Sequence, residues 1–125
     1  MEKMGFNRGD YVEFGYSGQL LHGTLLNIYP TAEGMRIGVV LVSGEIFNTF
    51  YSHIENLRKI PKFKKLERIK IGQVVSYTVD GGWELLGLIG RVTKIGPYSI
   101  FINGRNISIN DLFAISPQKC RNYRE

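Results

Sequence analysis

The sequence predicts an all-β protein built from two tandem repeats of one small five-stranded unit. Four blocks of pattern occur twice, in the same order, along the 125-residue chain, which indicates a duplication. Fifteen glycines, with many valine, isoleucine, tyrosine and phenylalanine residues, favour strands joined by tight turns over helices. A repeat of about 60 residues is near the lower size limit for a core that folds alone. We therefore expect the two repeats to support one another.

Each repeat begins with a short strand in which apolar and polar residues alternate. The segment Phe6–Phe14 of the first repeat returns as Ile69–Tyr77 in the second. Within the first of these segments, Val12 and Phe14 flank Glu13, and this period of two is typical of a half-buried strand.

The second block predicts a long strand with a glycine inside it. Leu21–Ile28 and Leu88–Ile95 share the pattern Leu-x-Gly-x-(Leu/Val)-x-x-Ile. Gly23 and Gly90 therefore occupy equivalent places, where a glycine marks a bend or a close backbone approach. A strand bent in this way turns the corner of a small barrel.

The last two blocks predict a tight hairpin and a short turn. Ser43-Gly44 and Asn103-Gly104 lie between apolar runs, and Asn-Gly is the strongest short hairpin signal. Residues 52–54 and 110–112 then place a capping side chain before an apolar residue, which predicts a single 3₁₀ turn followed by a last short strand. Between the second and third strands, the first repeat is expected to have a long loop at residues 29–36.

This order of elements resembles the small SH3-like barrels of the KOW and Tudor type. Members often open with Gly-Asp-x-Val, as in Gly9–Val12, and carry Gly-x-Val-x-x-Ile, as in Gly90–Ile95. The resemblance implies two tandem SH3-like five-stranded barrels, each with a 3₁₀ turn before its last strand. Such barrels host nucleic-acid binding, ribosome and polymerase contacts, methylated-peptide capture and protein docking, so the resemblance alone does not choose a function.

Apolar residues on both faces of the third strand predict that the two barrels pack together. Leu41 and Phe101 fall on the opposite face from Val40 and Ile100. We expect the neighbouring barrel to cover Leu41 and Phe101, which favours a compact pair.

Charge divides the chain into four segments. We expect a first barrel at residues 1–61, a basic connector at 62–70, a second barrel at 71–117 and a basic tail at 118–125. The net charge of +5 is concentrated, because residues 58–70 carry seven basic side chains and one acidic one. Residues 1–57 carry three basic and six acidic side chains, so the first repeat is acidic.

The sequence argues against catalysis, a metal site or a cofactor. Only His22 and His53 are histidines, no Cys/His cluster has metal-ligand spacing, and no nucleotide-binding glycine fingerprint precedes a helix. Cys120 is the single cysteine and has no partner for an internal disulfide, and no apolar run approaches a membrane span. We expect a cytoplasmic, non-enzymatic protein with no membrane partner.

The connector is the strongest candidate binding site. Phe63, Leu66 and Ile69 recur every third residue, so they are expected to pack on a barrel while the lysines project into water. The expected nucleic-acid-binding residues are Lys62, Lys64, Lys65, Arg68 and Lys70, helped by Arg91, Lys94 and Arg105. An equally weighted alternative is a solvated linker, or one whose charges attract the acidic first repeat and fix the two barrels relative to each other.

A second candidate site is an aromatic patch of Tyr16, Trp83 and Tyr98, which lie in or near loops. Such rings cage a methylated cation or stack on bases, although aromatic residues at these places more often belong to the core. The favoured expectation is a module that binds nucleic acid or a nucleic-acid-bound machine. The rival is a protein-interaction adaptor that docks a basic or methylated peptide. A third possibility is a small protein of phage or mobile-element origin that modifies a host machine.

Overall fold

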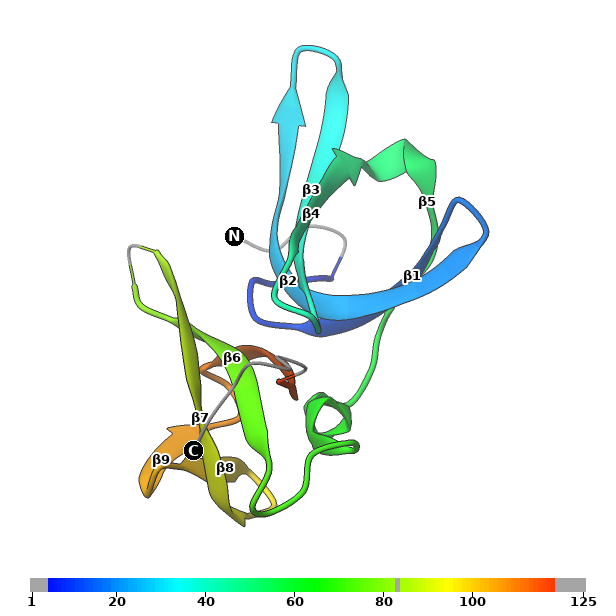
Figure 1. Cartoon of the computed structure of the whole chain (residues 1–125). Coiled ribbons are helices and arrows are strands. Elements are labelled where there is room, and N and C mark those ends of the chain that lie inside the picture. Colours follow the sequence, from blue (N-terminus) through cyan, green and yellow to red (C-terminus); the bar gives the residue numbers. More distant parts are fainter. Residues whose placement is uncertain (1–4, 83, 119–125) are drawn as a thin grey trace.

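The computed structural model describes residues 5–82 and 84–118, and this part of the chain is all-β, as predicted (Figure 1). The strands are β1 (Tyr11–Tyr16), β2 (Gln19–Thr31), β3 (Gly34–Leu41), β4 (Ile46–Phe50), β5 (Ile54–Lys59), β6 (Val74–Asp80), β7 (Leu85–Ile95), β8 (Ser99–Ile102), β9 (Arg105–Ser108) and β10 (Leu112–Pro117). Two 3₁₀ helices complete the described elements, η1 (Tyr51–His53) before β5 and η2 (Lys62–Leu66) between β5 and β6.

The same sheet topology occurs twice. The first five strands form an antiparallel sheet in the order β4-β3-β2-β1-β5, and the last five form a second one in the order β10-β6-β7-β8-β9. Read from the last strand of each repeat, the two orders are β5-β1-β2-β3-β4 and β10-β6-β7-β8-β9. Each strand of the second sheet therefore takes the place of its counterpart in the first. The duplicated sequence pattern therefore folds into two copies of one sheet, which lie one above the other in Figure 1.

The predicted closure of each sheet into a barrel is not found among the described residues. The strands β4 and β5 lie at opposite edges of the first sheet, and β9 and β10 lie at opposite edges of the second. The 3₁₀ helix η1 carries the chain from one edge to the other, so a turn and not a ladder connects the two edges. In the second repeat, residues 109–111 form only a hydrogen-bonded turn, in which the Asp111 N–H donates to the Ser108 carbonyl (3.0 Å).

Gly23 and Gly90 lie where the long strands change partners, as predicted. Before Gly23, β2 pairs with β1, and beyond it with β3. In the same way β7 passes from β6 to β8 just after Gly90. A Cβ atom on Gly23 would lie 2.3 Å from the Val40 carbonyl oxygen, and one on Gly90 would lie 2.5 Å from Cγ2 of Ile102. Only glycine allows so close an approach.

The long loop predicted at residues 29–36 is instead an extension of the β2–β3 hairpin. Tyr29 pairs with Arg36, and the ladder continues to Thr31 and Gly34. The Thr31 hydroxyl also donates to the Gly34 carbonyl (2.7 Å). The ladder satisfies the backbone groups that a loop would leave to water.

The two predicted β-hairpins have different turns. Asn103 (φ 54°) and Gly104 (φ 78°) both adopt the left-handed conformation that a two-residue hairpin needs. At Ser43-Gly44 the turn is longer, because the Leu41 N–H donates to the Glu45 carbonyl (2.8 Å).

The two faces of β3 are reversed relative to the sequence prediction. Leu41 packs against the first core, and Val40 faces the second repeat. The expectation that the neighbouring repeat covers Leu41 is therefore wrong by one residue.

A hydrophobic cluster joins the two repeats. Each repeat has its own core, and Val40, Phe113 and Ala114 form a third buried cluster between them. The Thr24 hydroxyl donates across this contact to the Phe113 carbonyl (2.6 Å). The repeats thus form a compact pair.

Candidate nucleic-acid interface

The connector packs on the second repeat through two of its three periodic apolar residues. Leu66 and Ile69 are buried in the second core, as predicted. Phe63 is 56% exposed, which is contrary to prediction. It lies in the first turn of η2, beyond the edge of that core, and faces Pro97 and Tyr98 in the β7–β8 turn.

Lys65 is buried, so the prediction that it projects into water and contacts phosphate is wrong. Its side chain is 3% exposed, and Nζ donates to the carbonyl oxygens of Ile109 (3.2 Å) and Leu112. The ammonium also lies 5.4 Å from the centre of the Tyr11 ring in the first repeat. These partners come from two segments that are distant in sequence, the start of β10 with the turn before it and β1, so Lys65 links the connector to both repeats.

The surroundings of Lys65 shift two pKa values. Burial, with a smaller contribution from Lys62, lowers the pKa of Lys65 to about 8, because an ammonium loses its hydration there. Burial, with a smaller contribution from Glu67, raises the pKa of Tyr11 to about 12.

The other basic residues of the connector remain at the surface. Lys62 is half-buried and donates to the Asn110 side chain (2.9 Å), and Lys64 forms an exposed ion pair with Glu67 (3.7 Å). Arg68 and Lys70 are exposed, and in the part of the chain that the structure describes neither forms an ion pair. The positive charge available to a ligand is therefore concentrated on Lys64, Arg68 and Lys70.

Two further predicted residues lie on β7 of the second sheet. The Arg91 guanidinium donates to the carbonyl of Gly72 (2.6 Å), which places it just beyond Lys70. Lys94 is exposed and lies over the Phe101 ring (5.3 Å), on the outer side of the same sheet.

Arg105 does not join this surface. It pairs with Ile102, whose side chain belongs to the second core, so the two residues share the inner face. There Arg105 lines a hollow of about 200 Å³ together with Asp80 and Asp111. Nearby carboxylates make this place unfavourable for phosphate.

Phe63 of the connector and Tyr98 of the β7–β8 turn form an exposed aromatic pair. Phe63 and Tyr98 together line two adjoining hollows of about 470 and 350 Å³, and Lys62 lines the second. Tyr98, a residue of the predicted aromatic patch, is 78% exposed. Tyr16 is not beside it, because its ring packs edge-on against Phe47 (4.8 Å) in the first repeat. Trp83 lies outside the described residues.

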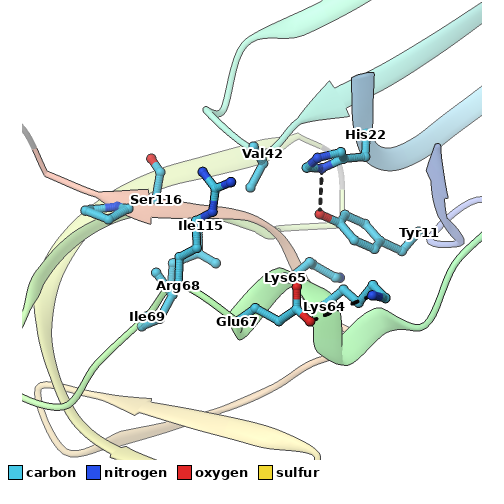
Figure 2. Close-up of a pocket in the computed structure, with 11 residues that line it drawn as sticks. Tyr11, His22, Val42, Lys64, Lys65, Glu67, Arg68, Ile69, Ile115 and Ser116 are labelled. Atoms are coloured by element: carbon cyan, nitrogen blue, oxygen red, sulfur yellow. Dashed lines mark hydrogen bonds and ion pairs between the residues drawn. The ribbon is translucent and has the colours of Figure 1, made fainter. Parts of the chain in front are cut away.

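A cavity of about 180 Å³ marks the junction of the connector with both repeats (Figure 2). The Tyr11 hydroxyl and Nδ1 of His22 are hydrogen-bonded on one side of it (3.2 Å), and Arg68 rises from the connector toward the first repeat on the other. Lys64 and Glu67 lie along the lower wall. The cavity is too small for a nucleotide, but it brings Lys64 and Arg68 to one mouth.

The acidic charge of the first repeat is partly neutralised from within. Arg58 pairs with Glu13 (3.0 Å) and Lys59 with Asp10 (3.6 Å), since β5 runs alongside β1. Both pairs lie within the first repeat, so they do not test the alternative that the charges of the connector attract that repeat. Sequence reasoning missed both this pairing and the exposure of Phe63.

A comparison with protein-family models and a search of curated proteins each found no match to this chain. Over residues 5–82 and 84–118, no group of three or more His, Cys, Asp or Glu side chains is placed to hold a metal ion. No helix in the same residues is long and apolar enough to cross a membrane.

Proposed function

We propose that the chain is a non-enzymatic module that binds single-stranded nucleic acid along the connector. One observation carries this proposal, namely that exposed Phe63 and Tyr98 line a hollow together with Lys62, in the same connector whose Lys64, Arg68 and Lys70 face solvent. Aromatic faces stack on unpaired bases, and cations held along the same strip neutralise the phosphates between them. A duplex hides its base faces, so the aromatic pair favours a single strand.

We further propose that each repeat is an SH3-like unit of the KOW and Tudor type. Its support is the order of five strands, the long second strand bent at a glycine, and the short turn before the last strand. In this proposal the sheets act as a rigid support that positions the connector.

The rival function, capture of a methylated or basic peptide, needs an unoccupied aromatic face. A hollow of about 600 Å³ beside Phe50 and Tyr51 is the best candidate in the described part of the first repeat. The Arg36 guanidinium already lies over the Phe50 ring (4.6 Å), and the His53 ring packs edge-on against it (5.5 Å). The protein's own cation thus occupies that ring, which favours the nucleic-acid proposal.

The test is a fluorescence-anisotropy titration of labelled single-stranded and double-stranded DNA and RNA at low ionic strength. We expect the single strands to bind more tightly. We expect F63A and Y98A each to weaken binding roughly tenfold, which is the loss of one stacked base. The control I46A removes an exposed apolar side chain elsewhere and should leave binding unchanged.

A second pair of variants tests the charges. The double variant K64Q/K70Q should weaken binding by about tenfold or more. The matched control R58Q/K59Q removes the same charge from β5 of the first repeat, outside the connector, and should have a smaller effect. No binding at low ionic strength, or equal losses in the two double variants, would refute the proposal and favour the peptide-binding reading.

A further inference from the structure

The first half of β7 is an open sheet edge. Residues 85–89 pair with β6 on one side, whereas the pairing of β7 with β8 begins only at Val92. In the described residues, no strand lies along the other side of this segment. Figure 1 shows the β6–β7 hairpin extending away from the body of the second sheet. Residues 86–89 are exposed, and Leu85 is half-buried against the cluster between the repeats.

The hydrogen bonds of β7 show which backbone groups face outward. The Glu84 carbonyl accepts from Gly81 across the hairpin (2.9 Å), so Glu84 points toward β6. Backbone N–H and C=O groups point alternately to the two sides of a strand. Arg91, seven residues after Glu84, therefore points away from β6. Its N–H donates to Oδ1 of Asn103 (3.0 Å), and its carbonyl accepts from the Asn103 N–H (2.8 Å). The same alternation points the N–H and C=O groups of Leu85, Gly87 and Ile89 away from β6.

This edge carries none of the features that normally prevent strand pairing. Leu86, Leu88 and Ile89 are 43%, 38% and 53% exposed, and residues 85–89 contain no charge and no proline. Proteins usually protect an exposed edge with lysine, proline or a bulge. An apolar, unprotected edge indicates a surface that is covered in the working protein.

We propose that a second molecule of this chain covers the edge, with the two β7 strands antiparallel about a two-fold axis through Gly87. In this register Gly87 pairs with Gly87, and Leu85 pairs with Ile89 of the second molecule. Every outward N–H and C=O of these residues then has a partner. One continuous sheet results, with β7 of each molecule at its centre.

The side chains fit the same two-fold register. On one face, Leu86 of each molecule lies directly opposite Leu88 of the other, in the close pair type whose Cα atoms are about 4.5 Å apart. Gly87 presents no side chain at the axis, and a Cβ built there meets no atom within 4 Å, so the surroundings are open. A segment that complements itself in this way favours a second molecule over a foreign strand, because a two-fold interface needs the same patch on both sides.

Sedimentation velocity of the full chain, from low-micromolar to sub-millimolar concentration, tests the association. The expected result is a concentration-dependent dimer. L88K and I89K should each weaken the dimer at least about tenfold, because each places a charge in the paired edge. The control I71K adds the same charge at an isoleucine outside the edge that is 65% exposed, and should leave the dimer intact.

Disulfide cross-linking tests the register independently. In a C120S background, G87C should cross-link to itself on mild oxidation, because opposed residues of such a pair lie within disulfide range. L85C alone should not cross-link, whereas a mixture of L85C and I89C should. A monomer at all concentrations, a dimer that survives L88K and I89K, or cross-linking of L85C alone would each overturn the proposal. Circular dichroism of each variant verifies that it is folded.

Discussion

Lys65 is a buried lysine within a segment that its sequence predicts to be an exposed basic strip. The other basic residues of the connector are exposed or half-buried, yet Lys65 is buried against two backbone carbonyls and the Tyr11 ring. Local pattern cannot reveal this burial, because the carbonyls belong to Ile109 and Leu112, more than 40 residues away in the chain. Phe63 is the opposite case, because it continues the apolar period of Leu66 and Ile69 and yet is 56% exposed.

The lowered pKa of Lys65 predicts a specific pH dependence of stability. The folded protein releases this proton near pH 8 and the unfolded chain near 10.5, so between these values the unfolded chain holds more protons. The cost of burying the charge is fully present below pH 8 and is relieved as the pH rises. Relative to K65M, the free energy of unfolding of the natural chain should therefore increase by roughly 2 kcal/mol between pH 8 and 10.

Urea unfolding at several pH values measures this difference. The control K64M, on the exposed side of the same helix, should run parallel to the natural chain over this range. At pH 7, K65M should be less stable by about 1–3 kcal/mol because two buried carbonyls lose their donor. Parallel curves for K65M and the natural chain would show that Lys65 is not buried as a charge.

At the scale of the strands, the sequence pattern predicted correctly those features that depend only on residues close together in the chain. The alternation around Glu13, the Asn103-Gly104 turn and the glycine bends are short-range features, and the structure confirms them. The β2–β3 extension at residues 29–36 and the one-residue shift at Leu41 were not predictable, because they depend on pairing across strands and on turn length. Barrel closure was inferred from the glycine bends and from the resemblance, and neither determines whether the two edge strands pair.

The two glycine bends should respond differently to substitution. A methyl group on Gly23 meets the Val40 carbonyl and the Leu41 Cα, which are backbone atoms, whereas on Gly90 it meets the side chains of Ile102 and Asn103. Side chains move more easily than a paired strand. We expect G23A to lower the free energy of unfolding by about 3 kcal/mol and G90A by about 1–2 kcal/mol. Chemical denaturation measures both, and an equal or reversed order would contradict the assigned contacts.

At the scale of the whole molecule, the junction between repeats determines cooperativity. Phe113 and Val40 are fully buried where the sheets meet, and Thr24 adds a hydrogen bond there. Each repeat is small for independent folding, so the junction should couple them. The sequence indicated a compact pair, but only the folded register identified Val40 and Phe113 as its centre.

Calorimetry tests this coupling. The natural chain should unfold in one transition, with calorimetric and van't Hoff enthalpies that agree. F113A should destabilise the protein by about 3–4 kcal/mol and broaden or split the transition. L20A, which truncates an exposed side chain of the first repeat, serves as the control and should change neither. Two well-separated transitions in the natural chain would mean that the repeats fold independently.

The basic connector could be predicted from sequence as a charged strip, but the division of its cations between packing and solvent could not. The number of cations that face solvent sets the expected salt dependence of nucleic-acid binding. Lys64, Arg68 and Lys70 face solvent, and each contact with a single strand contributes about 0.7 to the salt dependence of binding.

The most direct test is the affinity for a labelled single strand, measured as a function of salt concentration. A plot of log K against log salt should be linear, with a slope of about −2 that K64Q/K70Q reduces to about −0.7. A slope near zero, a slope that the double variant leaves unchanged, or no binding at the lowest salt would contradict the assignment of the connector as a nucleic-acid interface.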